Sequence, residues 1–358
     1  MGRLLLILKP FMLLDPTILF FVLGIAAGLL RSNLDIPAAV SRFLSLYLLM
    51  ALGLKGGFAL ADSGLTRSIF TSLSVAVLMA FLVPLIGYVV LKRLTNSFDA
   101  AAIAAAYGSV SAVTFITATQ VGQSQGLADA GHMAVALVLM ETPAIIVALM
   151  LAVYIRSKPS AKGAATGLPA GSTGRSGATE APIDQPADGE QGVGMKLGHL
   201  LKESLTDGSQ MILLGALAIG LITGKHGETM MQPFAGDIFK GMLALFLLDM
   251  GLNVARRMRA HFKVPTPLIV YSVISPFVHA SLVLGFAYLL GLPATDTFLL
   301  MVLSASASYI VVPAVLRDAM PEANSAWYLG LSLAVTFPLN VLVGIPVYLQ
   351  AVKWTVGF

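Results

Sequence analysis

The sequence predicts an all-α polytopic membrane protein, and its composition is the first observation that does so. Of 358 residues, 57% are hydrophobic and only 11% are charged, whereas a soluble domain has about a quarter charged residues. Such a chain has too few polar residues to cover soluble domains. The net charge of +4 is too small to indicate nucleic acid as a partner. The absence of cysteine excludes disulfides and thiolate sites.

The second observation is a series of apolar stretches, each close to the roughly 20 residues that a helix needs to cross the hydrocarbon core. Strands are not expected, because open strand edges are excluded from lipid and no alternating barrel pattern is visible. We therefore predict ten transmembrane helices, at 17–30, 36–60, 68–91, 100–128, 130–155, 208–224, 231–255, 264–295, 297–316 and 323–352.

The third observation is a repeat. Residues 1–155 and 208–358 are nearly equal in length, and matching features lie at nearly the same offset in the two parts. The matched pairs are Leu52-Gly53-Leu54 with Met250-Gly251-Leu252, Asp99 with Asp296, Ser109 and Ser111 with Ser306 and Ser308, and Pro143 with Pro338. We predict two five-helix repeats, at 1–155 and 208–358. Because five is odd, the second repeat enters the membrane inverted.

Two segments lie outside the predicted helices. Residues 1–14 carry basic residues and an apolar run, but they lack a small-residue cleavage site and contain Pro10. We interpret them as an interfacial lead-in rather than a signal peptide. Residues 156–207 are polar and poor in large apolar residues, so they are expected to form a flexible loop or a regulatory docking segment.

The positions of lysine and arginine predict the orientation. With ten helices and the N-terminus outside, most of the 22 Lys and Arg residues fall in inner loops, including Lys92, Arg93 and the basic run at 256–263. Cytoplasmic loops carry such an excess. Both termini are therefore expected outside, and residues 156–207 are expected in the cytoplasm.

Small and hydroxylated residues predict interruptions in the fourth and ninth helices. Residues 108–114 read GSVSAVT, and residues 304–308 read SASAS, followed by Pro313. One such run would suggest close helix packing. Two runs at matched positions of an inverted repeat indicate the broken helices between which secondary transporters bind substrate. The amino ends of the half-helices would attract a small anion.

Glu141 is the natural carboxylate for a coupling cation at this site, because an ionisable residue inside the membrane favours a function. The alternatives are a proton site or a protonated structural glutamate. Asp249 either has a similar role or faces the aqueous interface, and His279 is expected to pack. Neither an HExxH motif nor a Walker loop is present, so a zinc protease and an ATP-driven pump lose support.

Short motifs in this order resemble the sodium-dependent bicarbonate transporter family, first known from cyanobacteria. They are Gly53-Leu54-Lys55-Gly56-Gly57, Gly108-Ser109-Val110-Ser111, Met140-Glu141-Thr142-Pro143, Glu203-Ser204-Leu205, Pro276-Phe277-Val278-His279 and Glu322-Ala323-Asn324. The resemblance implies a gate domain from helices 1, 2, 6 and 7 and a core domain from the others. It also implies a homotrimer, sodium–bicarbonate symport and a PII-like cytoplasmic regulator. In the ninth helix, Tyr309 and the single Pro313 replace an acidic residue and a proline pair, which is similar to a proteobacterial-like branch.

The resemblance and the matched runs together predict the site residues. Substrate is expected at Gly108, Ser109, Ser111, Ser304, Ser306 and Ser308. The cation is expected near Thr114, Glu141 and Tyr309, with sodium bound by Ser111, Glu141 and Ser306.

The predicted function is sodium-coupled uptake of bicarbonate across a bacterial inner membrane by alternating access. No enzyme activity and no cofactor are expected, and the partners are bicarbonate, sodium and membrane lipid. Two alternatives remain open. One is a sodium- or proton-coupled carrier of a small organic anion, and the other is a ligand-sensing or scaffold protein that acts through the central loop.

Overall fold

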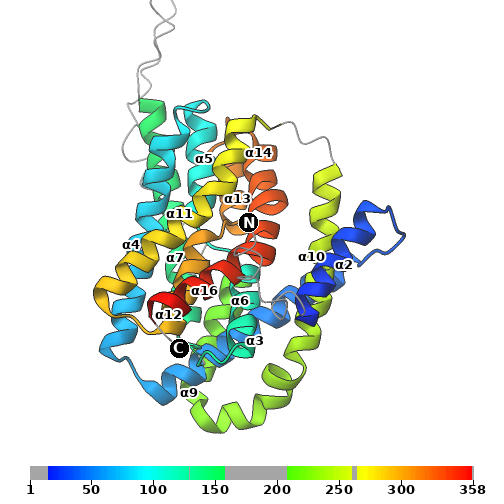
Figure 1. Cartoon of the computed structure of the whole chain (residues 1–358), viewed down its shortest axis with the longest axis vertical. Coiled ribbons are helices and arrows are strands. Elements are labelled where there is room, and N and C mark those ends of the chain that lie inside the picture. The colour runs from blue at the N-terminus through cyan, green and yellow to red at the C-terminus, as the bar shows by residue number, and fades with distance from the viewer. Residues whose placement is uncertain (1–14, 129, 158–207, 260–263, 357–358) are drawn as a thin grey trace, which may run out of the picture.

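The computed structural model describes residues 15–128, 130–157, 208–259 and 264–356 (Figure 1). Within these ranges every regular element is helical. The predicted lead-in at 1–14 and nearly all of the central loop at 156–207 lie outside the described residues. The helices of the first part are α2 (Pro16–Leu29), α3 (Ala38–Ser63), α4 (Arg67–Leu91), α5 (Ser97–Gly108), α6 (Ala112–Ser124) and α7 (Met133–Ser157).

The second part begins with one long irregular run. Helix α9 (Gly208–Met231) is kinked at Gly224, where φ is 51°, and continues through a π-helical turn, η1 (Gln232–Asp237), into α10 (Phe239–Arg259). The break at Gly224 lies where the predicted sixth span ends, and a short second helical segment follows it to Met231. The remaining elements are α11 (Thr266–Leu290), α12 (Ala294–Ala305), α13 (Val311–Ala319), α14 (Ser325–Gly330), η2 (Leu331–Thr336), α15 (Phe337–Leu339), η3 (Asn340–Gly344) and α16 (Ile345–Thr355).

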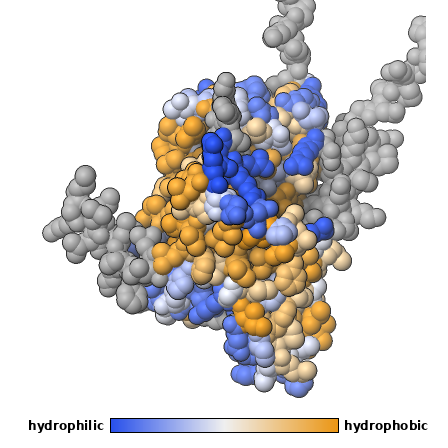
Figure 2. Space-filling model, turned by 90° about the vertical axis from the view of Figure 1, so that its right-hand side faces the viewer, coloured by the Kyte–Doolittle hydropathy of each residue, from blue (hydrophilic) through white to orange (hydrophobic). Residues whose placement is uncertain are grey.

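Seven helical stretches of the described chain are long and apolar enough to cross a membrane, and α2 and α12 are shorter apolar helices. Apolar side chains also cover much of the outer surface: Phe70 is 70% exposed, Ile222 82% and Leu289 78%. On the face seen in Figure 2, hydrophobic residues occupy the middle and hydrophilic residues gather towards both ends. This distribution suits a protein surrounded by lipid and makes the chain a multi-pass membrane protein.

Local sequence explains several helix ends. The Asp15 carboxylate accepts the backbone N–H of Thr17 at 2.9 Å, and Pro16 occupies the first turn of α2. Thr66 and Asn96 cap α4 and α5 in the same way. Gly291, with φ at 65°, ends α11, so the predicted eighth span divides there into a helix and its exit. Side-chain caps and a left-handed glycine are the usual signals for helix boundaries.

Glycines bring two helix pairs into backbone contact. A Cβ atom at Gly24 of α2 would lie 2.2 Å from the Leu248 carbonyl oxygen of α10. At Gly57 of α3 it would lie 2.2 Å from the Leu217 carbonyl oxygen of α9. Such close approach is a common way for helices to associate in membranes. The pairs α2–α10 and α3–α9 each join one helix from either part of the chain.

Two buried carboxylates lie in the first turns of α5 and α12 and bind distant segments. Asp99 accepts the backbone N–H of Asn324 at 2.6 Å, just before α14. Asp296 accepts the Ser72 hydroxyl at 2.6 Å, and its other oxygen lies 3.0 Å from the Nε2 atom of His132, just before α7. Each carboxylate therefore holds the start of a helix that belongs to the other part of the chain.

Arg156 and Glu322 join the ends of α7 and α13 near the Asp99 contact. The guanidinium donates from Nε at 2.9 Å and from Nη2 at 2.8 Å to the two carboxylate oxygens, and Nη2 also reaches the Ala319 carbonyl. These hydrogen bonds lower the pKa of the Glu322 carboxyl from its ordinary value. The pair is partly exposed, so its main effect is to orient the chain rather than to stabilise it strongly.

We expect Asp99→Ala to lower the free energy of unfolding by roughly 1–3 kcal/mol, because it removes a buried, charged acceptor of the Asn324 N–H. Asp99→Asn retains an acceptor oxygen and should cost less. Thermal unfolding of the purified protein in detergent measures both effects. Asp62→Ala, at an exposed carboxylate, is the control, and equal melting temperatures for Asp99→Ala and Asp62→Ala would contradict this role.

Candidate functional site

The helices predicted at 100–128 and 297–316 are both interrupted near their middles. Helix α5 ends at Gly108, and α6 begins at Ala112 after extended residues at Ser109 and Ser111. Helix α12 ends at Ala305, Ser306 is extended, and α13 begins at Val311. In Figure 1, α5 lies towards the upper end and α12 towards the lower end, so the two broken helices run in opposite directions.

The two interruptions are hydrogen-bonded directly to each other. The Ser111 N–H donates to the Ser306 hydroxyl oxygen at 2.9 Å. The Ser308 N–H donates to the Ala106 carbonyl at 2.8 Å. Backbone groups that the interruptions free from their helices therefore find partners in the opposite interruption, which membrane burial requires. The two serine runs singled out in the sequence meet here.

The residues of the interruptions also stabilise their own geometry. The Ser111 hydroxyl accepts from the Thr114 N–H at 3.3 Å and from the Thr114 hydroxyl at 3.0 Å, which caps α6. The Ser306 hydroxyl donates to the Leu303 carbonyl at 2.7 Å. Gly108 packs against α4, since a Cβ atom there would lie 2.6 Å from the Pro84 ring.

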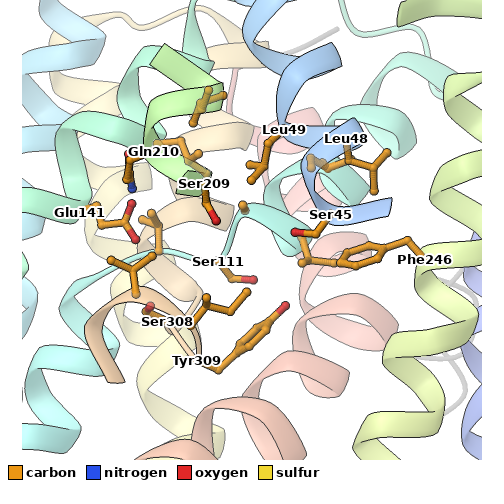
Figure 3. A pocket seen from close by; sticks show the side chains of 18 residues that line it. Ser45, Leu48, Leu49, Ser111, Glu141, Ser209, Gln210, Phe246, Ser308 and Tyr309 are labelled. Atoms are coloured by element: carbon orange, nitrogen blue, oxygen red, sulfur yellow. The ribbon is translucent and has the colours of Figure 1, made fainter. Parts of the chain in front are cut away.

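A cavity of about 60 Å³ lies beside the paired interruptions (Figure 3). One water molecule needs about 10–15 Å³ of such free volume, so the cavity has room for a few waters or one small ion. It is lined by Ser45, Leu48 and Leu49 of α3; Val110–Val113 and Ile116 around the start of α6; Leu137 and Glu141 of α7; Ser209, Gln210 and Leu213 of α9; Phe246 of α10; and Ser308–Val311.

Polar atoms converge on this cavity from several helices. Figure 3 shows Glu141 beside Gln210, with the Ser45, Ser111 and Ser209 hydroxyls and the Tyr309 ring around the same space. Glu141 is 7% exposed, and its carboxylate is the only one in the lining. No lining residue is a lysine or an arginine. An anion in this cavity would therefore be bound by dipoles and hydroxyls rather than by a basic side chain.

The structure divides the predicted site residues into two groups. Ser111, Ser308, Glu141 and Tyr309 line the cavity. The others lie within or next to the interruptions but outside the cavity lining; they are Gly108, Ser109, Thr114, Ser304 and Ser306. Asp249 and His279 also lie outside the lining, and Asp249 accepts a hydrogen bond from Ser41 at 2.6 Å.

Three buried hydroxyls at the interruptions have no hydrogen-bond partner among the described residues, namely those of Ser109, Ser304 and Tyr309. Ser109 is 1% exposed and Ser304 is 2% exposed. Most buried polar groups are hydrogen-bonded, so an unpaired cluster indicates a place where water or a ligand supplies the missing partner.

Residue patterns did not point to Ser45, Ser209, Gln210 or Phe246. These residues come from α3, α9 and α10, whose sequences contain no matched serine run. Gln210 is a buried amide in an apolar helix, and that amide is the one signal that could have drawn attention to α9.

No curated protein matches this chain. The family model described as Na+-dependent bicarbonate transporter superfamily matches residues 16–353, which is nearly the whole chain. The matched range includes both interruptions, Glu141 and every other residue that lines the cavity. The chain therefore belongs to the Na+-dependent bicarbonate transporter superfamily.

Proposed function

We propose that this protein takes up bicarbonate together with sodium across a bacterial inner membrane. Membership of the superfamily supports sodium and bicarbonate as the transported ions. The structural observation that supports the site is the cavity where the starts of α6 and α13 and the Glu141 carboxylate converge. The protein acts as a transporter and not as an enzyme.

The proposed architecture is ten membrane crossings in two inverted five-helix repeats, residues 1–155 and 208–358. Two features of the fold support it. Gly24 and Gly57 contact α10 and α9, respectively, so the first helix of each repeat pairs with the second helix of the other. Asp99 and Asp296 each hold the start of the other repeat's fifth helix. Contacts exchanged in this reciprocal way are expected of repeats related by a two-fold axis.

The anion is proposed to bind between the first turns of α6 and α13. The first four N–H groups of a helix lack partners within it, and each helix start carries about half a positive charge. Val113 and Val311 line the cavity in these first turns. The Ser308 and Tyr309 side chains would orient the bicarbonate oxygens.

The sodium ion is proposed to bind at Glu141, Ser111 and Ser306. Sodium prefers oxygen ligands, which the carboxylate and the two hydroxyls would provide. The Ser306 oxygen accepts one N–H and donates its own proton, which leaves one lone pair for an ion. The Ser111 oxygen accepts twice from Thr114, so it would bind the ion once the Thr114 hydroxyl turns away from it. Thr114 and Tyr309 lie next to this set. A cation beside the anion would reduce the desolvation cost of both charges.

Alternating access is proposed to arise from movement between two groups of helices. The gate would comprise α2, α3, α9 and α10, which contact one another through glycines. The core would comprise the broken helices with α4, α7, α11 and the C-terminal helices. Ser45, Ser209 and Phe246 reach the cavity from the gate side, so a shift of the gate against the core would open the cavity to one side at a time.

The positions of the basic residues support an orientation with both termini outside and residues 156–207 in the cytoplasm. On the resemblance described above, a homotrimer and a PII-like cytoplasmic regulator are proposed as well.

Radiolabelled bicarbonate uptake into proteoliposomes tests the function. We expect an inward sodium gradient to drive accumulation, because Glu141 requires a bound cation. Potassium should be unable to replace sodium, because the superfamily is Na+-dependent. Uptake that is independent of sodium would contradict the proposal. Strong competition by formate or acetate would instead support the carrier of a small organic anion.

We expect Glu141→Gln to abolish most of the sodium stimulation, because it keeps the shape of the side chain but removes the charge that binds the cation. Ser111→Ala should weaken uptake by about tenfold, since it removes both a ligand and the cap of α6. Ser281→Ala, on the outer face of α11, is the matched control. Wild-type sodium dependence in Glu141→Gln would refute the cation site.

A further inference from the structure

The final helix of the chain is irregular where it passes the two interruptions. Between α14 and α16 it contains two π-helical stretches, η2 (Leu331–Thr336) and η3 (Asn340–Gly344), separated by the short α15. π-Helical turns have poorer geometry than α-helix and are found frequently at functional sites. Each stretch carries a buried polar residue, Thr336 and Asn340, which are both 0% exposed.

Asn340 binds the end of the broken helix α12. Its Nδ2 atom donates to the Ala305 carbonyl at 2.8 Å. Its Oδ1 atom accepts from the Tyr348 hydroxyl at 3.0 Å. A carbonyl can only accept, so the Ala305 contact determines which way the amide points. Gly344 leaves the space for it, because a Cβ atom there would lie 2.5 Å from the Asn340 Oδ1 atom.

The Ala305 carbonyl is the last one of α12 before the extended Ser306. The final carbonyls of a helix lack partners within it and carry a partial negative charge. A cation or a hydrogen-bond donor must therefore satisfy this group inside the membrane. The Asn340 amide is a neutral donor that does so, and Tyr348 holds it in position.

The corresponding place in the first repeat is different. Pro143 and Pro338 correspond, so Asn340 corresponds to Ile145 and Glu141 corresponds to Thr336. Ile145 is buried and has no donor. Thr336 is already engaged, with its hydroxyl 2.6 Å from the Tyr107 hydroxyl and donating to the Ser272 carbonyl at 3.0 Å. The first repeat therefore carries a carboxylate, while the second carries a fixed amide.

We propose that Asn340, held by Tyr348, is a positioning residue. Its amide stands where a cation would otherwise neutralise the carboxyl end of α12, and it thereby fixes residues 306–310 for binding the anion. This inference rests on the proposed function for what binds. Asn340 itself acts through Ser308 and Tyr309, which follow Ala305 in the chain and line the cavity. Bicarbonate affinity should therefore depend on the donor at position 340.

Uptake by three variants tests this role. Asn340→Leu removes the donor at similar size and should raise the half-saturating bicarbonate concentration by about tenfold, with less effect on the maximal rate. Tyr348→Phe frees the amide and should have a smaller effect of the same kind. Val347→Ala, at a 37% exposed side chain of α16, is the control and should match the wild type.

The pH dependence of uptake by Asn340→Asp distinguishes this positioning role from a purely structural one. An ionised carboxylate repels the Ala305 carbonyl, whereas a protonated carboxyl donates to it. Position 340 is 0% exposed, and such burial disfavours the charged form of a carboxyl. Uptake relative to wild type, at the same pH and bicarbonate concentration, should therefore be lower at about pH 8 and recover towards about pH 6 as this carboxyl is protonated. A pH-independent ratio, or unchanged half-saturation in Asn340→Leu, would overturn the inference.

A separate measurement keeps the inference distinct from the proposed function. The chain has no cysteine, so Ile310→Cys provides one thiol at the cavity, and its labelling rate by a charged thiosulfonate reports the order of residues 306–310. We expect faster labelling when Asn340→Leu is added and no change with Val347→Ala. If the wild type does not transport bicarbonate but labelling still depends on position 340, the proposed substrate is wrong and the positioning role stands. Equal labelling rates would refute that role.

Discussion

The site depends on one interaction, the hydrogen bonding of two interrupted helices to each other. Ser111 and Ser308 donate their backbone N–H groups across the pair, to Ser306 and Ala106. An isolated break in a membrane helix would leave several unpaired backbone groups, each costing several kcal/mol in hydrocarbon. By pairing the breaks, the fold satisfies part of this requirement and still directs the starts of α6 and α13 to a common cavity.

The surrounding helices hold α5 and α12 at both their outer and their inner ends. Asp99 and Asp296 fix the outer ends of α5 and α12. Asn340 and Thr336 contact the inner ends through the final helix. Helices α5 and α12 are therefore held at each terminus. Only the few central residues that line the cavity keep freedom to move. A binding site with such a supporting shell can discriminate between ions by position as well as by charge.

The sequence alone predicted the features that depend on local residue type. The serine runs at 108–114 and 304–308 fall at the interruptions, and Asp99 and Asp296 fall in the first turns of the broken helices. Contacts made in three dimensions could not be predicted. Ser45, Ser209 and Gln210 reach the cavity from helices without a marked pattern. The π-helical stretches η2 and η3 were not predicted either, although Pro338 and Pro346 beside them each remove a backbone donor from the helix.

The exchanged contacts between the two parts of the chain have a consequence for biogenesis. Helix α2 packs on α10, and the Asp99 carboxylate binds the backbone of Asn324. In both cases the ribosome synthesises the second partner more than two hundred residues after the first. The early helices must therefore reside in the bilayer with unsatisfied surfaces until translation is nearly finished. Assembly of this molecule is consequently a late event, in which the nascent helices sort themselves laterally after insertion rather than docking one by one as they emerge.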